Sequence, residues 1–290
     1  MEFLNQNTPI HLVNGVNIPC IGYGTWQTPA GEVAAVSVRA ALEAGYRHID
    51  AASAYGNEEG VGEGIQTSGV HRDEIFLTSK LNNPDHGYEQ TKRAFAESLK
   101  ALKTDYLDLY LIHWPNPISC RNNWEEMNAA TWKAMEELYE SGQIKAIGVS
   151  NFRQHHFEAL AKTANVAPMV NQISLSPGLT QTSICSYCQE HGMVMEAYSP
   201  LGTGRILQLE EMRYFAEKYN HSIAQICIRW SLQMGFIPLP KSINASRIRE
   251  NINVFDFKLS DEDVSTIASI QALRQRYTII SVCSMPVQEL

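Results

Sequence analysis

Four reactive side chains stand at or just beyond the ends of three successive apolar runs in this chain. They are Asp50, Tyr55, Lys80 and His113. Their chemistry suits the reduction of a carbonyl group, which needs a hydride on the carbon and a proton on the oxygen. A phenol with an ordinary pKa of ~10 is a poor acid at neutral pH, but a nearby ammonium lowers that pKa. We therefore expect Tyr55 to donate the proton and Lys80 to tune it.

The other two residues have supporting roles in this hypothesis. A partly buried ammonium is costly without a partner, so Asp50 is predicted to compensate Lys80. His113 is predicted to donate a hydrogen bond to the substrate oxygen and to orient it. Each residue also has an ordinary structural explanation, as half of a barrel ion pair or as a packed ring. Their occurrence together at strand ends favours catalysis.

Short apolar runs that alternate with amphipathic stretches must hold these residues in place. Eight runs are predicted as β-strands, at residues 19–22, 48–50, 75–80, 107–113, 144–150, 169–173, 194–199 and 236–241. Helices are predicted between them, for example at residues 32–43, 88–102, 124–139 and 222–233, where apolar residues recur at helical spacing. This alternation predicts a parallel sheet with right-handed crossovers.

The number of strand–helix units predicts an α/β fold of the closed (β/α)8 type, a TIM barrel, in one domain over residues 1–290. The competing architecture is an open doubly wound sheet, which is expected to carry a Gly-x-Gly-x-x-Gly turn after its first strand. Gly22-Tyr23-Gly24 does not extend into that pattern. In a barrel the chemistry lies at the C-terminal strand ends. Neighbouring strands lie ~4.8 Å apart, so the four reactive side chains can converge there.

The two ends of the chain are predicted to cover the two ends of the barrel. Residues 10–17 are expected to form an N-terminal β-hairpin with Asn14-Gly15 as its turn, placed under the bottom. The C-terminal tail, residues 272–290, has no clear periodicity. It is expected to dock over the barrel mouth.

Composition limits the classes of protein to consider. The net charge is −8, whereas a duplex-binding protein needs an excess of Lys and Arg, so no nucleic-acid partner is expected. No stretch approaches the ~18 consecutive apolar residues of a membrane span, and the polar N-terminus lacks a secretory signal. A cytoplasmic protein with six reduced cysteines is therefore expected. Cys185 and Cys188 are interpreted as two thiols on one helix face, and no metal site is predicted.

Polar residues at the ends of the fifth to seventh predicted strands offer a place for a carboxamide such as that of nicotinamide. Ser150, Asn151 and Gln172 supply donors and acceptors, and Tyr198 can stack on the same ring. Ordinary hydrogen bonding at the barrel rim explains any one of them equally well.

A phosphate site is predicted after the eighth strand. Lys241, Ser242 and Arg247 place two cations and a hydroxyl at the start of a short helix, in the position where barrels often hold a phosphate. The small residues of loop 199–205 would let its backbone approach a pyrophosphate. The alternative is a solvated basic helix end, but local positive charge in an acidic chain favours the phosphate.

From the first strand to Asn251 the chain resembles the aldo-keto reductases. Residues 45–52, followed by residues 55–58, are similar to that family's first signature, and residues 239–242 with Arg247, Glu250 and Asn251 are similar to its C-terminal signature. Residues 148–152 and Asn171-Gln172 strengthen the likeness. The patterns are long, so chance matches are not a satisfactory explanation.

The resemblance implies a barrel without a Rossmann domain, NADPH as cofactor, and Asp50, Tyr55, Lys80 and His113 as the catalytic tetrad. It assigns to cofactor binding Gly24, Thr25, Trp26, Asp50, Ser150, Asn151, Gln172, Tyr198, Ser199, Leu201, Gly202, Lys241, Ser242, Ile243, Arg247, Glu250 and Asn251. Within that set, Lys241, Ser242 and Arg247 would bind the adenosine 2′-phosphate. The implied substrate pocket contains Trp26, Tyr55, His113 and Trp114.

The chain departs from the family pattern after the sixth strand. Ser174 and Ser176 stand where many members carry an acidic residue and a histidine, and Gly178 replaces a common aromatic. These changes put the local loop packing in question but touch no tetrad member. Residues 115–123 and the tail lie where the family varies most, so the physiological carbonyl substrate stays open.

The predicted function is NADPH-dependent reduction of an aldehyde or ketone, with Tyr55 as general acid and a small-molecule carbonyl as the partner. One alternative is a cofactor-binding regulatory barrel with little turnover, as in the potassium-channel β subunits. Another is a phospho-sugar lyase or isomerase that uses Lys80 as a Schiff-base nucleophile. A monomer is predicted, with a weak dimer as the alternative.

Overall fold

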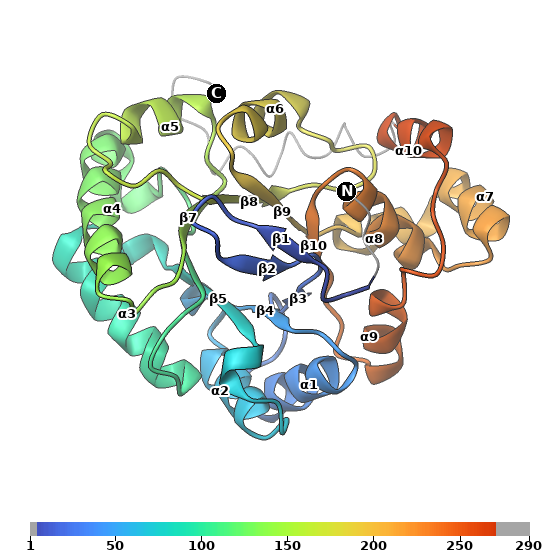
Figure 1. The fold of residues 1–290 in the computed structure, drawn as a ribbon, viewed down its shortest axis with the longest axis horizontal. Coiled ribbons are helices and arrows are strands. Elements are labelled where there is room, and N and C mark those ends of the chain that lie inside the picture. Colours follow the sequence, from blue (N-terminus) through green and yellow to red (C-terminus); the bar gives the residue numbers. More distant parts are fainter. Residues whose placement is uncertain (1–4, 271–290) are drawn as a thin grey trace.

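The computed structural model is a barrel of eight parallel strands surrounded by helices, and it describes residues 5–270 (Figure 1). The strands are β3 (Tyr23–Gly24), β4 (His48–Asp50), β5 (Phe76–Leu81), β6 (Leu109–Ile112), β7 (Ile147–Ser150), β8 (Val170–Ser174), β9 (Val194–Tyr198) and β10 (Ile237–Leu239). Each pairs in parallel with the next one along the chain. Backbone bonds of 3.0 Å from Gly22 N to Pro238 O and from Gly24 N to Pro240 O join the first strand to the last. The predicted closed barrel is therefore confirmed.

Helices cover the outside of the barrel. They are α1 (Glu32–Glu43), α2 (Glu58–Gln66), α3 (Tyr88–Leu102), α4 (Trp124–Glu140), α5 (Gln154–Leu160), α6 (Thr182–Glu190), α7 (Glu210–Tyr219), α8 (Ile223–Gln233), α9 (Ala245–Ile252) and α10 (Asp261–Ala268). The four helices predicted from sequence are α1, α3, α4 and α8. Ser222, predicted inside the last of these, instead caps α8: its hydroxyl accepts from Gln225 N, and the Gln225 side chain accepts from Ser222 N.

The first predicted strand, residues 19–22, has the wrong bounds. Pro19 ends the hairpin strand β2 (Asn17–Pro19), and the barrel strand β3 begins only at Tyr23. Cys20 and Ile21 between them are fully buried. The apolar run therefore marks a buried connection, which a short run of this kind does not distinguish from a strand.

The N-terminal hairpin lies across the end of the barrel where the strands begin (Figure 1). β1 (Pro9–His11) pairs antiparallel with β2, and Gly15 adopts a φ of 84° in the turn, as the Asn14-Gly15 motif predicted. Asn14 Nδ2 donates to Lys145 O at 3.0 Å, just before β7 begins. The hairpin thus closes the end opposite the C-terminal strand ends. The predicted tail, residues 272–290, lies outside the described residues.

The departure at Gly178 has a packing explanation. Gly178 adopts a φ of 74°, and a Cβ at this position would lie 2.2 Å from Ile270 O. Ser176 and Leu179 exchange two backbone hydrogen bonds of 3.2 and 2.8 Å around it. Any side chain here would collide with the backbone of Ile270, so this tight turn requires glycine.

The two cysteines of the C-x-x-C spacing lie one turn apart on α6, as predicted. Cys188 is buried and its Sγ lies 3.5 Å from Asn171 Nδ2, whereas Cys185 is half-buried. Both are free thiols, like the other cysteines of residues 5–270. Within that range no group of three or more His, Cys, Asp or Glu could hold a metal ion.

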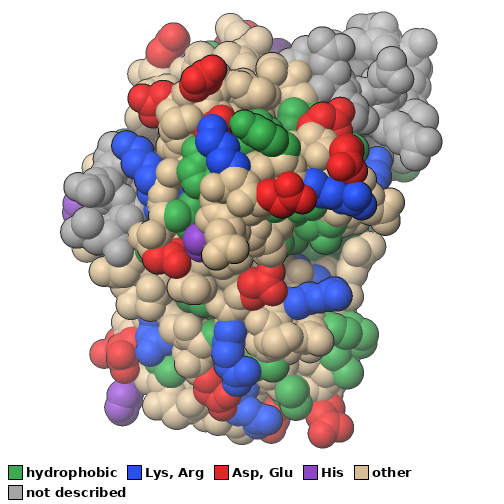
Figure 2. All heavy atoms as spheres, turned by 90° about the vertical axis from the view of Figure 1, so that its right-hand side faces the viewer, with side chains coloured by type: hydrophobic (Ala, Val, Ile, Leu, Met, Phe, Trp, Pro, Cys, Tyr) green, Lys and Arg blue, Asp and Glu red, His purple; other side chains and the backbone are tan. Residues whose placement is uncertain are grey.

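Acidic and basic side chains are interspersed over the face of the molecule shown in Figure 2. Among the described residues on that face there is no continuous basic field of the kind that a nucleic-acid backbone requires. None of the helices described is long and apolar enough to cross a membrane.

Candidate active site

A cavity of about 1200 Å³ opens where the C-terminal ends of the strands meet. Residues that end or follow every barrel strand except β5 line it. The predicted site residues among them are Gly24, Trp26, Asp50, Tyr55, His113, Trp114, Ser150, Asn151, Gln172, Tyr198, Ser199, Leu201, Lys241, Ser242, Arg247, Glu250 and Asn251. This end of a barrel is where enzymes of this architecture carry their chemistry, so the cavity is the candidate active site.

The remaining predicted residues do not line the cavity. Lys80 is completely buried beneath its floor. Thr25 is buried too, and its hydroxyl donates to Asp50 O at 2.9 Å, so it supports the end of β4. Gly202 is buried within the loop after β9, and Ile243 is 53% exposed. The cofactor contacts of all the predicted residues, those of Thr25, Gly202 and Ile243 included, stay predictions.

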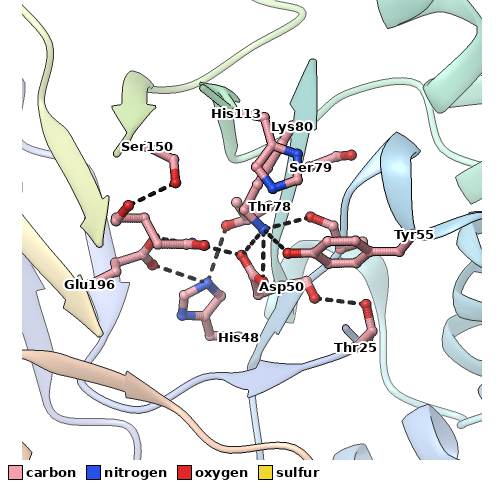
Figure 3. Close-up of polar contacts among 12 residues, drawn as sticks. Thr25, His48, Asp50, Tyr55, Thr78, Ser79, Lys80, His113, Ser150 and Glu196 are labelled. Carbon is pink, nitrogen blue, oxygen red and sulfur yellow. Dashed lines mark hydrogen bonds and ion pairs between the residues drawn. The ribbon is translucent and has the colours of Figure 1, made fainter. Parts of the chain in front are cut away.

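Lys80 is the centre of the predicted tetrad (Figure 3). Its Nζ lies 2.7 and 2.8 Å from the two carboxylate oxygens of Asp50, 2.9 Å from Ala51 O and 3.2 Å from Tyr55 Oη. An ammonium can only donate hydrogen bonds. The single buried ammonium of Lys80 therefore donates to a carboxylate, a carbonyl oxygen and a phenol oxygen. The structure thus brings Asp50, Tyr55 and Lys80 into contact, as the sequence predicted.

The turn that carries Tyr55 is anchored by the residues that follow it. The tyrosine ends a short 3-10 helix, η1 (Ser53–Tyr55). Asn57 is buried and donates to Thr25 O at 2.9 Å. Glu58 begins α2, and its carboxylate accepts a 2.6 Å bond from Ser79 Oγ. The first signature therefore combines a reactive phenol with the side chains that tie its loop to the barrel.

His113 follows β6 and faces the phenol. Its ring lies edge-on to that of Tyr55, with the centroids 5.7 Å apart, and Asn151 Nδ2 donates to its carbonyl at 3.0 Å. Burial, with the nearby charge of Lys80, lowers the pKa of His113 to about 3. The imidazole is therefore neutral at physiological pH, with one N–H to donate.

The expected lowering of the Tyr55 pKa is wrong in direction. Burial of the phenol is the largest influence and raises its pKa above the ordinary value, while the charge and hydrogen bond of Lys80 oppose the rise. Burial also lowers the pKa of Lys80, but Asp50 and Tyr55 outweigh it and the net direction is upward. At neutral pH the phenol therefore keeps its proton and the amine keeps its charge, which are the states that proton donation requires.

A hydrogen-bonded row of side chains forms one wall of the cavity. Tyr198 Oη donates to Asn151 Oδ1 at 2.9 Å, Asn151 Nδ2 donates to Ser150 Oγ at 3.0 Å, and Ser150 Oγ donates to Gln172 O at 2.7 Å. Each hydroxyl and carbonyl oxygen has two lone pairs. The row can therefore still accept hydrogen bonds from a ligand while its own geometry stays fixed.

The opposite end of the cavity is basic. Lys241 Nζ donates to Gln27 O at 3.1 Å, which links the loops after β10 and β3. Arg247 lines the cavity from α9 and is exposed. Asn244 caps α9, and its Oδ1 accepts from Ser246 N and Arg247 N at 2.9 and 3.3 Å. Because those helix amides are occupied, a phosphate here would be bound by the side chains of Lys241 and Arg247.

Sequence reasoning missed part of the cavity wall. The missed residues include Gln27, Phe152, Arg153, Leu179, Gln181 and Leu207. They follow β3, β7, β8 and β9, so the rule that barrel sites are built from the loops at strand ends points to their positions. Nothing in their residue types would have identified them singly.

The fold and the site together define a barrel oxidoreductase in which a buried ammonium–carboxylate pair supports a phenol at the floor of a cavity with a basic end. A model of the Aldo/keto reductase family matches residues 20–272. The chain therefore belongs to the aldo/keto reductase family, and the resemblance seen in its motifs is confirmed. Enzymes of this family are oxidoreductases that act on aldehydes and ketones with NADP(H).

The likeness to individual relatives extends well beyond the motifs. The chain is 49% identical over 261 residues to glyoxal reductase of Bacillus subtilis, covering 90% of this chain and 92% of that protein. It is 41% identical over 265 residues to methylglyoxal reductase DkgA of Escherichia coli, with coverages of 91% and 93%. The structure of a Bombyx mori aldo-keto reductase in complex with NADP matches with a TM-score of 0.81 and 37% identity, over 91% of this chain and 92% of that one.

Proposed function

We propose that this chain reduces an aldehyde or ketone to an alcohol with NADPH, and that Tyr55 is the general acid. The observation that carries the proposal is the 3.2 Å contact between Lys80 Nζ and Tyr55 Oη, with Asp50 on the same ammonium, at the floor of the cavity. A phenol that keeps its proton beside a fixed cation is equipped to release that proton to an oxygen placed above it.

The residues divide the chemistry between them. When bound, NADPH supplies the hydride for the carbonyl carbon. Tyr55 donates its proton to the carbonyl oxygen and becomes a phenolate, which the Lys80 ammonium stabilises. Asp50 holds that ammonium through two hydrogen bonds. His113, neutral and beside the phenol, donates a hydrogen bond that orients the carbonyl oxygen.

The cavity suits a nicotinamide dinucleotide phosphate at both ends. A row of amide and hydroxyl groups fits a carboxamide, and the cations Lys241 and Arg247 at the basic end of the cavity fit phosphates. The residues proposed to hold the cofactor are Ser150, Asn151, Gln172 and Tyr198 around the nicotinamide, Leu201, Lys241, Ser242 and Arg247 around the phosphates, and Glu250 and Asn251 near the adenine.

The substrate is proposed to be a small carbonyl compound held between Trp26 and Trp114, which line the cavity near Tyr55 and His113. Two relatives are named for glyoxal and methylglyoxal, so 2-oxoaldehydes stand first in a panel that also contains sugars, keto-acids and aromatic aldehydes. NADPH oxidation, followed by absorbance, tests the proposal. We expect turnover with at least one aldehyde. Binding of NADPH with no turnover across the panel would instead support the regulatory barrel.

The lyase or isomerase alternative is disfavoured by the state of Lys80. A Schiff-base nucleophile must be a neutral amine within reach of the substrate. Lys80 is fully buried, does not line the cavity, and has its pKa raised by Asp50 and Tyr55 against the effect of burial. Borohydride trapping with phospho-sugars is accordingly expected to label nothing at Lys80.

Preference for NADPH over NADH is proposed to depend on Arg247. A lost charge-assisted contact to a phosphate is worth about 10-fold or more in affinity, so Arg247→Ala should raise the NADPH dissociation constant by about that factor. The NADH constant should change little, because NADH lacks the 2′-phosphate. Arg249→Ala is the matched control, since Arg249 is exposed on the same helix but does not line the cavity. Equal effects of Arg247→Ala on both cofactors would contradict the contact.

We also propose that the protein is a cytoplasmic monomer. Sedimentation of the purified chain measures the oligomeric state directly. A stable dimer would correct this part of the proposal and leave the catalytic assignment unchanged.

A further inference from the structure

A second polar layer lies directly under the tetrad and has no part in the mechanism so far. Glu196 on β9 and His48 on β4 are both fully buried inside the barrel (Figure 3). Glu196 Oε1 lies 3.5 Å from His48 Nε2, and the same nitrogen lies 3.1 Å from Thr78 Oγ1. An interior position of this kind is usually filled by an apolar side chain. The presence of the Glu196 carboxyl group there therefore requires an explanation.

Gln172 connects this layer to the tetrad. It is the register partner of Glu196 on the neighbouring strand. Its Nε2 donates to Glu196 Oε2 at 2.8 Å and, across the barrel, to Asp50 Oδ1 at 2.8 Å. Asp50 is the counter-ion of Lys80 and can only accept, so the group that Gln172 turns toward it must be the amide nitrogen. An amide nitrogen has two hydrogens, and the two carboxyl groups engage both.

We propose that Glu196 is a positioning residue for the cofactor: it holds the Gln172 amide with both N–H groups pointing into the barrel, so that Gln172 Oε1 is the atom presented to the cavity. The inference rests on the proposed function, because Gln172 lines the cavity where the nicotinamide carboxamide is placed. An oxygen fixed in this way accepts a hydrogen bond from an N–H donor. Gln172 therefore recognises the amino group of the carboxamide.

The charges around Glu196 agree with this role. Burial raises the pKa of Glu196, and the negative charge of Asp50 adds to the rise, while the hydrogen bond from Gln172 and the charge of Lys80 oppose it. Burial and the charge of Lys80 lower the pKa of His48 to about 3. These directions favour a protonated acid and a neutral imidazole. Glu196 thus offers a carbonyl-type acceptor to Gln172 without adding a second negative charge beside Asp50.

A cofactor analogue measures the orientation of Gln172 separately from turnover. In the 3-acetylpyridine analogue of NADP⁺ a methyl group replaces the amino group, so it keeps the carbonyl oxygen and loses the N–H donor. For the wild-type chain we expect NADP⁺ to bind about 2- to 10-fold more tightly than this analogue, the range for one neutral hydrogen bond. Quenching of tryptophan fluorescence reports both dissociation constants, since Trp26 lines the cavity.

Two substitutions at Glu196 then separate positioning from simple packing. Glu196→Gln keeps an oxygen for Gln172 Nε2 and should preserve the ratio of the two dissociation constants. Glu196→Leu removes the acceptor for the second N–H, leaves Asp50 alone to hold the Gln172 amide, and should lower the ratio toward one. Glu196→Met, which fills the space with a longer unbranched chain, replaces Glu196→Leu if the latter does not fold. In a Gln172→Leu background the Glu196 substitutions should have no further effect on the ratio.

The outcomes discriminate between this inference and the proposed function. If the wild-type chain discriminates and the Leu and Met variants discriminate equally well, Glu196 does not position Gln172 and the inference is overturned. If the wild-type chain binds neither compound, it is the proposed function that fails. A ratio that collapses in the Leu or Met variant and survives in the Gln variant supports the inference.

Discussion

Replacing Tyr55 by phenylalanine is expected to lower kcat by at least about 10²-fold, because positioned general acids contribute about 10²–10⁴-fold. The change removes one hydroxyl and leaves the ring, its edge-on contact with His113 and the cation above its face in place. The affinity for NADPH should survive, since the cofactor contacts are proposed to lie elsewhere. Steady-state turnover and the NADPH dissociation constant, measured on the same preparation, check both parts.

A matched control for this prediction is Tyr110→Phe. Tyr110 is fully buried and packs edge-on against Phe95 with the ring centroids 5.2 Å apart. Its hydroxyl has no hydrogen-bond partner among residues 5–270 and does not line the cavity. Removing that hydroxyl should leave kcat unchanged. Wild-type turnover in Tyr55→Phe, or an equal loss in both variants, would rule out Tyr55 as the proton donor.

The tetrad could be predicted from the sequence because its members are tied to strand ends. Asp50 ends β4 and Lys80 lies in β5, and parallel pairing of neighbouring strands brings such residues to one end of the barrel. Only the type of residue and its place at a strand end are needed for that argument. The same argument located Ser150, the last residue of β7, and Gln172 in the second half of the predicted sixth strand, although Gln172 is the middle residue of β8.

The layer beneath the tetrad could not be predicted in the same way. Glu196 contacts His48 across the barrel, and Gln172 contacts Asp50 across it as well. Such contacts depend on the stagger of the closed sheet, which fixes the height of each side chain inside the barrel. A pattern of apolar runs gives the order of the strands but not that stagger.

The direction of the Tyr55 pKa shift could not be predicted from the sequence either. Proximity to a lysine was predictable, and it acts in the expected sense. The depth of burial was not predictable, and it is the larger influence. The consequence for the proposed function is favourable, since a proton donor needs a pKa above the working pH, and Lys80 would stabilise the negative charge that develops on the phenol.

Breaking the Asp50–Lys80 pair on either side is expected to destabilise the fold by about 3–5 kcal/mol, because removing one partner leaves the other charge buried and uncompensated. Asp50→Asn and Lys80→Met are the single variants. The double variant should be more stable than either single one, since an uncharged pair of similar volume leaves nothing to desolvate. Urea unfolding of the wild-type chain, the two single variants and the double variant gives the four free energies of unfolding and the coupling between the two sites.

Turnover should follow a different order from stability in the same four proteins, and that difference is what identifies the pair as part of the catalytic machinery. The double variant regains folding free energy but has no ammonium beside Tyr55, so its kcat should stay as low as that of Lys80→Met. The Lys103–Glu63 pair, also 2.7 Å apart but with 38% and 53% of the two side chains exposed, serves as the control, and its removal should change stability and kcat little. Recovery of turnover in the double variant would show that Tyr55 needs no buried cation. Unchanged stability in both single variants would show that the pair is screened by water. Either result would require a different explanation of how Tyr55 is positioned and how its phenolate is stabilised.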